Sequence, residues 1–130
     1  MILLKHRIIS GLVLILLDYL WLNTFMVSKY NVMIQKIQGS KLNVNFIFMI
    51  LTYFLMIMGL NLFVLSNINP GTKSIYDSLR YGFLFGIVLF GIYDFTAASV
   101  FDNWDISLAM YDILWGGVLY FLSSYSIKFM

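Results

Sequence analysis

Three aspartates interrupt long apolar stretches of the chain, at Asp18, Asp94 and Asp112. A carboxylate at the centre of a bilayer costs about 2.5–3.5 kcal/mol on insertion scales, so such residues face the interior of a helix bundle or a water-filled cavity. No lysine or arginine is expected at their depth. Because desolvation and mutual repulsion both disfavour ionised acids, three carboxyl groups in one dry layer must hold protons, a cation or water. These residues therefore predict a site that binds protons or a cation.

The depths of the three acids are compatible with a single layer. At about 1.5 Å per helical residue, Asp94 and Asp112 each lie roughly 10 Å from the outer end of their apolar stretch, and Asp18 lies slightly deeper. The layer would fall in the middle to outer half of the membrane. The acids belong to three different stretches, so a bundle could bring them together.

Tryptophans accompany two of the acids. Asp18 and Trp21 are three residues apart, as are Asp112 and Trp115, which places each acid and indole on one helical face. An indole N–H can donate a hydrogen bond to a carboxylate. Further polar side chains that could support the acids are Asn23, Tyr93, Thr96 and Tyr111.

Each of these features has a structural alternative. Protonated or hydrogen-bonded aspartates can join helices, as polar groups do in bilayers. Tryptophans also collect in the interfacial aromatic belts. We assign Trp104 to such a belt and leave Trp21 and Trp115 open between the two roles.

Smaller features indicate helix packing. Gly82 and Gly86 form a G-x-x-x-G pattern, which is typical of close helix contacts, and Gly91 and Gly116 extend it. Asn61 is expected to form a hydrogen bond between packed helices. His6, which stands beside two basic residues, is expected at the surface.

Four apolar stretches must position these residues, at about 8–27, 44–65, 79–101 and 106–127. Each has the roughly 20 residues that a membrane-spanning helix needs. The chain is 62% hydrophobic and 11% charged, whereas soluble domains have about 25% charged residues. We therefore expect an all-α fold, an integral membrane four-helix bundle with antiparallel up-down topology, as one transmembrane domain over residues 1–130. Residues 28–42 would form either a short interfacial helix or a solvated loop.

Basic residues near the helix ends predict the orientation. One side of the membrane would hold five basic residues, Lys5, Arg7, Lys73, Arg80 and Lys128. The other side would hold three, Lys29, Lys36 and Lys41. This excess favours both termini on the cytoplasmic side. The absence of glutamate and the scarcity of alanine indicate an AT-rich genome, viral or microbial.

Composition and motifs exclude several functions. The formal charge of +2 is too small to favour nucleic-acid binding, and there are no cysteines. The sequence has no phosphate-binding glycine loop, zinc-protease motif or nucleophile elbow. No cofactor is expected, and no catalytic residue is assigned. A metal held by aspartates and acting on a lipid phosphate stays open.

Two spaced motifs carry a resemblance to a known family. They are Tyr93-Asp94-Phe95-Thr96 and Asp112-Ile113-Leu114-Trp115-Gly116, together with Gly82, Gly86, Trp104, the pair Asp18 and Trp21, and Tyr30. With these motifs the chain resembles the bacterial membrane-protein family called domain of unknown function 2177. The resemblance implies a small four-span membrane protein without an established activity. Its polar positions fall on Asp18, Trp21, Tyr93, Asp94, Thr96, Asp112 and Trp115, and the chain departs from the family at Ala97, where asparagine is usual.

Three functional hypotheses follow. The first is a small channel- or transporter-like protein that handles protons or a cation at Asp18, Asp94 and Asp112. The second is a structural or accessory protein that organises lipid or partner proteins. The third is an enzyme that modifies a lipid. The expected partners are the lipid bilayer, a proton or cation, and a second copy of the chain.

Overall fold

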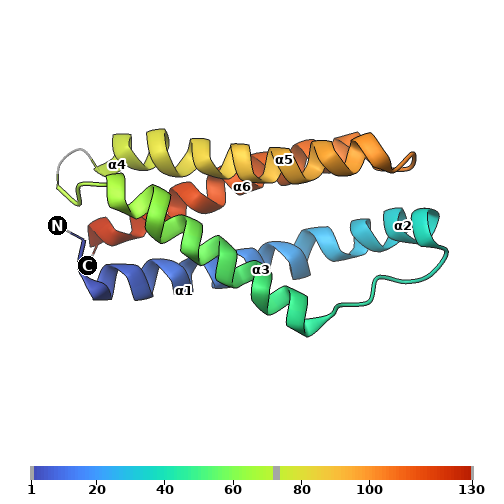
Figure 1. The fold of residues 1–130 in the computed structure, drawn as a ribbon, viewed down its shortest axis with the longest axis horizontal. Coiled ribbons are helices and arrows are strands. Elements are labelled where there is room, and N and C mark those ends of the chain that lie inside the picture. Colours follow the sequence, from blue (N-terminus) through green and yellow to red (C-terminus); the bar gives the residue numbers. More distant parts are fainter. Residues whose placement is uncertain (1, 72–73, 130) are drawn as a thin grey trace.

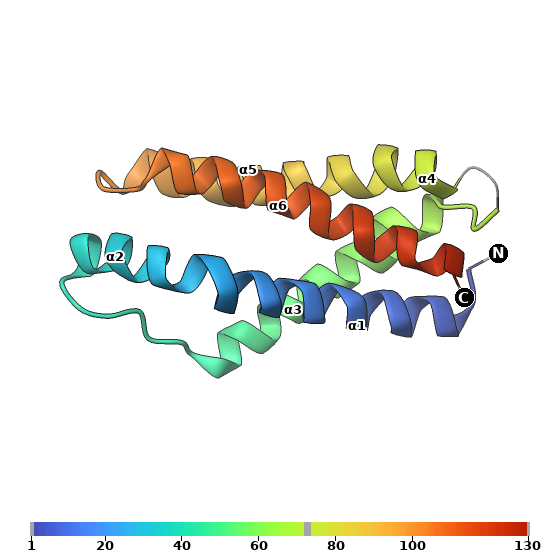
Figure 2. The same cartoon turned by 180° about the vertical axis from the view of Figure 1, so that it is seen from behind.

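The protein is described by a computed structural model that covers residues 2–71 and 74–129. Within these ranges, four helices are long and apolar enough to cross a membrane: Leu4–Gln38, Phe46–Asn67, Ser74–Val100 and Ile106–Phe129. They form an all-helical bundle, and no strand occurs in the described residues. The start of the first helix and the end of the last lie at the same end of the molecule (Figures 1 and 2). The up-down order across a bilayer and the side on which the termini lie stay predictions, and Lys73 lies outside the described residues.

The first helix is much longer than expected. It consists of α1 (Leu4–Trp21), a π-helical stretch (Leu22–Met26) and α2 (Val27–Gln38). Its 35 residues extend about 52 Å, against about 30 Å of hydrocarbon. The expectation of a separate interfacial helix or a loop from residue 28 is therefore wrong. The helix ends at Gly39, which adopts the left-handed conformation with φ of 76° that glycine tolerates best.

The helical pattern of α2 explains why it continues. Met26 and Met33 are buried, and Tyr30, Ile34 and Ile37 pack against the same cluster. These residues recur every three or four positions, which is one face of a helix. The polar residues between them occupy the opposite face, so they do not mark a loop.

The second long helix crosses the bundle obliquely (Figures 1 and 2). It comprises α3 (Phe46–Gly59), a π-helical stretch (Leu60–Val64) and a 3₁₀ turn (Leu65–Asn67). The Asn45 side chain caps its start by accepting hydrogen bonds from the backbone N–H groups of Ile47 and Phe48, at 3.1 and 3.3 Å. Most of its buried residues lie in the second half, whereas the first half is apolar and exposed. The beginning of α3 therefore lies apart from the other helices.

The other two helices pack side by side (Figure 1). One is built from α4 (Ser74–Asp77), a π-helical stretch (Ser78–Phe83) and α5 (Leu84–Val100). The other is α6 (Ile106–Tyr125), which continues as a 3₁₀ turn (Ser126–Phe129). Asp105 caps α6 through hydrogen bonds at 2.9 and 3.2 Å. α6 is the most enclosed helix, and half of its apolar window is buried.

Three of the four glycines assigned to helix packing lie at close approaches. A Cβ added at Gly82 or Gly86 would come within 2.8 or 2.9 Å of backbone atoms of α6. One added at Gly116 would collide with an aromatic side chain of α5. At Gly91 it would meet nothing within 4 Å, so the expectation of a close contact there is wrong. The close packing of this helix on α6 thus depends on Gly82, Gly86 and Gly116.

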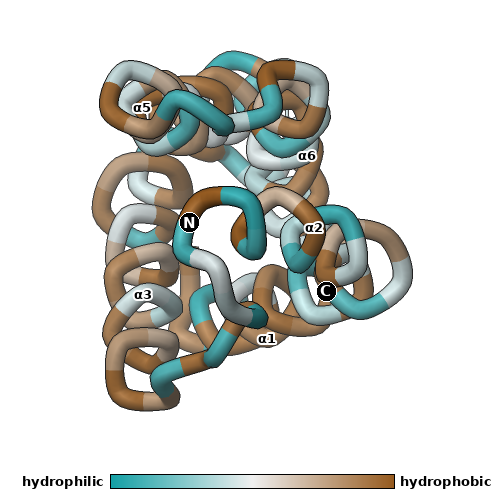
Figure 3. Tube along the Cα trace, turned by 90° about the vertical axis from the view of Figure 1, so that its right-hand side faces the viewer, coloured by the Kyte–Doolittle hydropathy of each residue, from teal (hydrophilic) through white to brown (hydrophobic). Residues whose placement is uncertain are grey.

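Polar contacts fix the end of the bundle where the first helix begins. The Arg7 guanidinium donates to the Oδ1 atom of Asn61 at 3.1 Å, which confirms the predicted helix-packing role of Asn61. His6 is buried, and its Nδ1 atom accepts a hydrogen bond from the backbone of Leu3 at 2.8 Å. The surface position expected for His6 is therefore wrong. The four long helices are apolar enough to cross a membrane, and α3 is mostly hydrophobic in Figure 3, as a lipid environment requires.

Candidate functional site

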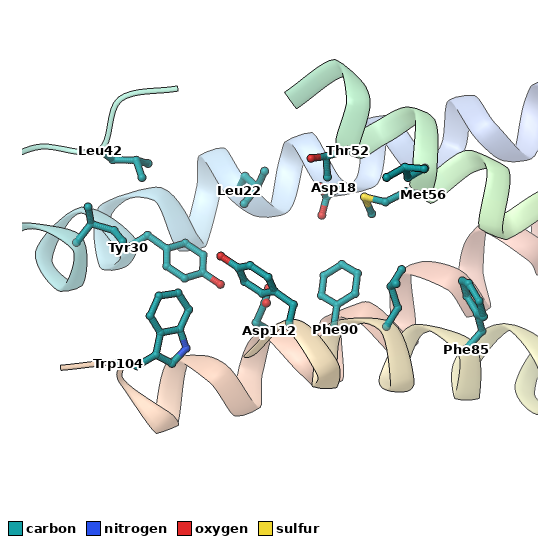
Figure 4. Close-up of a pocket in the computed structure, with 14 residues that line it drawn as sticks. Asp18, Leu22, Tyr30, Leu42, Thr52, Met56, Phe85, Phe90, Trp104 and Asp112 are labelled. Carbon is teal, nitrogen blue, oxygen red and sulfur yellow. The ribbon is translucent and has the colours of Figure 1, made fainter. Parts of the chain in front are cut away.

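A cavity of about 560 Å³ lies between the four long helices, beside Thr52, Leu55 and Met56 of α3 (Figure 4). All four long helices and two connecting segments contribute to its wall. Most of its lining is leucine, isoleucine, methionine and phenylalanine. The polar groups at the wall belong to Asp18, Asp112, Tyr30, Tyr93, Thr52 and Trp104. The oblique path of α3 explains the cavity, because a helix packed along its whole length would fill it.

Asp18 forms a hydrogen-bonded junction between three helices. The Tyr53 hydroxyl on α3 donates to its Oδ2 atom at 2.6 Å, and the Trp115 indole on α6 donates to its Oδ1 atom at 3.1 Å. Asp18 itself is 7% exposed. Two neutral donors stabilise a buried carboxylate by charge-assisted hydrogen bonds. Tyr53 was not anticipated, although it is the only tyrosine in the second apolar stretch.

Asp94 and Asp112 form a second acidic group. Asp94 on α5 is fully buried, and among the described residues neither of its oxygens has a hydrogen-bond donor. Asp112 on α6 is 7% exposed, and its carboxyl group lies beside that of Asp94. The Trp104 indole lies beside Asp94, and the Tyr30 hydroxyl lies beside Asp112. A proton between the two acids would therefore satisfy an oxygen that otherwise has no partner.

The three predicted acids thus fall into a pair and a separate residue. Asp18 lies on the wall of the cavity opposite Asp112 (Figure 4). Asp94 lies behind Asp112 and does not line the cavity. Within residues 2–71 and 74–129, no three histidine, cysteine or acidic side chains are grouped as metal ligands. The sequence predicts that each acid lies inside the bundle. It does not predict that Asp94 and Asp112 form a pair and that Asp18 is separate.

The tryptophans connect the helices that carry the acids. The rings of Trp21 and Trp115 stack with centroids 4.7 Å apart and an interplanar angle of 6°. Trp115 donates to Asp18 on another helix, not to Asp112 on its own. The Trp21 indole nitrogen is buried, and no partner for it occurs among the described side chains. Both rings therefore lie inside the bundle.

Several predicted supporting residues lie elsewhere. Asn23 is exposed and donates to the backbone carbonyl of Tyr19 in its own helix at 2.9 Å. Thr96 and Tyr111 are also exposed. The expectation that these three side chains surround the acids is wrong. Their helices present other faces to the cavity.

Two aromatic residues define the outer part of the cavity. Trp104 is only 9% exposed, so its assignment to an interfacial belt is wrong. It packs in a buried cluster with Met33 and meets the ring of Tyr93 edge to face, with centroids 6.0 Å apart. Tyr93 itself is 58% exposed and stands at the edge of the cavity. The extended α2 helix covers Trp104, so the ring packs inside the bundle and not in an interfacial belt.

The fold and this interior define the class of protein: an all-helical membrane protein with four spans. The chain belongs to a family described as predicted membrane protein, domain of unknown function 2177, whose model matches residues 3–127. No curated protein and no solved structure matches the chain. The family fixes a membrane location and leaves the activity open.

Proposed function

We propose that the chain is a small proton-handling membrane protein, in which Asp94 and Asp112 hold an exchangeable proton. The observation that carries this proposal is the fully buried Asp94 next to Asp112, with no donor for its oxygens among the described residues. Two adjacent carboxyl groups in a low-dielectric interior do not both ionise. One of them must keep a proton or bind a cation.

The cavity gives this proton a route. Asp112 lines the cavity, whereas Asp94 is enclosed behind it. A proton on the pair can therefore exchange with whatever enters the cavity, through Asp112. Asp18 completes the acidic wall on the opposite side, where it accepts hydrogen bonds from Tyr53 and Trp115. This arrangement supports a channel- or transporter-like role for the three acids.

Proton flux into reconstituted vesicles tests the proposal. A pH-sensitive dye inside the vesicles would report acidification after a pH or potential gradient is imposed. We expect flux from the wild type and from the control variant Asp102→Asn, because Asp102 is exposed in the α5–α6 loop. We expect loss of flux in Asp94→Asn. An unchanged flux in Asp94→Asn would overturn the proposal.

The structural hypothesis has one observation in its favour. Asp18 joins α1 to α3 and α6 through Tyr53 and Trp115, as a helix-joining acid would. A purely structural role predicts that replacing any of the acids lowers stability, and that the wild type conducts no protons. Measuring flux and unfolding on the same set of variants separates the two functions.

A further inference from the structure

We infer that the cavity binds a lipophilic organic cation, such as a bulky hydrophobic amine or onium ion, with Asp112 as its counter-ion. This inference rests on the proposed function, because the cation would pair with the negative charge that the singly protonated acid pair keeps. The inference depends on the cavity and not on the acids alone. The size, lining, charge and accessibility of the cavity all indicate which kind of ligand it binds.

Size comes first. The cavity of about 560 Å³ falls within the roughly 300–1,000 Å³ of small-molecule sites. A proton or a metal ion needs far less space. Because most of the wall is apolar, water alone would leave these side chains poorly solvated. An occupant with a large hydrophobic body fits better.

The charge of the wall selects a cation. Asp18 and Asp112 face the cavity from opposite sides, and none of the described residues that line it is basic. Asp18 already accepts two hydrogen bonds, whereas Asp112 has only the second acid and a tyrosine hydroxyl beside it. Asp112 is therefore the carboxyl group best able to pair with an incoming cation. An anion would meet two acids without a compensating charge.

Aromatic rings complete the recognition. Tyr30, Phe90 and Trp104 line the cavity around Asp112 (Figure 4). Tyr93 also lines the cavity. Aromatic faces attract cations, most strongly when the cation is desolvated. A carboxylate surrounded by aromatic rings is thus suited to an organic cation that leaves water behind.

Access to the cavity lies at the depth of the lipid. Leu55 on α3 and Tyr93 on α5 both line the cavity and are each 58% exposed. They belong to apolar helices that would lie within the bilayer. A ligand that partitions into lipid can therefore enter from the side, whereas a strongly hydrated ion cannot.

Binding of the cation would neutralise the acid pair. The titratable groups around Asp112 are Asp18 from α1, Tyr30 from α2, and Tyr93 and Asp94 from α5. With one proton between them, Asp94 and Asp112 together carry one negative charge, so one monovalent cation brings the pair to neutrality. The cation therefore binds without release of the shared proton, and it competes only with a second proton on the pair.

Tetraphenylphosphonium and tetraphenylborate form a matched pair of probes, because they share size and shape and differ in the sign of their charge. Calorimetry on the purified protein in detergent, in two buffers of different protonation enthalpy, would give the affinity and the protons released. We expect tetraphenylphosphonium to bind without release of the shared proton and tetraphenylborate not to bind. Equal binding of both ions would overturn the inference without any variant.

Variants then locate the site. Asp112→Asn should abolish binding of tetraphenylphosphonium, whereas Asp102→Asn in the exposed loop should bind as the wild type does. Tyr93→Leu, at the exposed edge of the cavity, keeps the acids and should weaken binding by roughly two- to thirty-fold. Unchanged binding in both Asp112→Asn and Tyr93→Leu would overturn the inference. If the probe fails to bind while wild-type vesicles still conduct protons, the inference fails and the proposed function stands.

Discussion

The packing of α5 on α6 gives a prediction that the same substitution at two glycines can test. Gly86→Ala would place a methyl carbon 2.9 Å from the Cα atom of Gly117, and nearer still to the carbonyl oxygen of Gly116. Ordinary contacts of a Cβ atom lie at 3.4–4 Å, so the two helices must move apart. Backbone atoms cannot rotate away as a side chain can. Gly91→Ala, on the same helix, would meet nothing within 4 Å.

The expected magnitude follows from two opposing terms. Overpacking a close contact costs about 1–3 kcal/mol, and replacing glycine with alanine in a helix gains up to about 1 kcal/mol. We therefore expect Gly86→Ala to lower the free energy of unfolding by roughly 1–2 kcal/mol. Gly91→Ala should leave it unchanged or raise it. Reversible unfolding in mixed micelles, followed by tryptophan fluorescence, would measure both, and equal stability of the two variants would refute the packing that we describe.

Three further predictions concern stability, measured by the same unfolding experiment. Tyr53→Phe removes the donor to Asp18 and should lower the free energy of unfolding by about 0.6–1.7 kcal/mol, the range for hydrogen bonds between membrane helices; no change would mean that this contact is not formed. Asn61→Leu leaves the Arg7 guanidinium without its side-chain acceptor and should cost about 1–3 kcal/mol, with neutrality as the contrary result. Trp104→Ala removes a buried ring and should cost about 3–5 kcal/mol, whereas a ring in an interfacial belt would cost much less.

The four-helix fold could be predicted from the sequence because the bilayer imposes simple rules. A helix in lipid needs about 20 apolar residues, and a polar group in it costs enough to indicate an interior position. These rules place Asp18, Asp94 and Asp112 inside the bundle, as the structure does. Asn69-Pro70-Gly71 likewise predicts the end of the second helix, which finishes at Asn67.

The same rules do not predict whether a helix continues beyond the lipid. Lys29, Asn31 and Gln35 indicate a solvated segment, but a helix that projects beyond lipid can carry such residues on its outer face. Only the contact of α2 with Trp104 and its neighbours reveals that the helix continues. The same contact buries Trp104, which its position in a short polar link between two apolar stretches does not predict.

Sequence spacing could not show that Asp94 and Asp112 form a pair while Asp18 is separate, because this arrangement depends on contacts between helices. Spacing predicts which face of a helix a residue shares, but not the angle at which helices cross. The oblique path of α3 brings Tyr53 to Asp18 and opens the cavity beside it. Thr96 and Tyr111 are exposed, and their separations of two residues from Asp94 and one from Asp112 already place them on other helical faces.

In the proposed function, Asp94 and Asp112 retain one proton inside the bundle at neutral pH. Infrared spectroscopy detects a protonated carboxyl group directly, through its C=O stretching band and the shift of that band in deuterated water. We predict such a band in the wild type and in Asp18→Asn, and its loss when Asp94 and Asp112 are both replaced by asparagine. A wild-type spectrum with no protonated carboxyl band, or a band that survives the double replacement, would contradict the account.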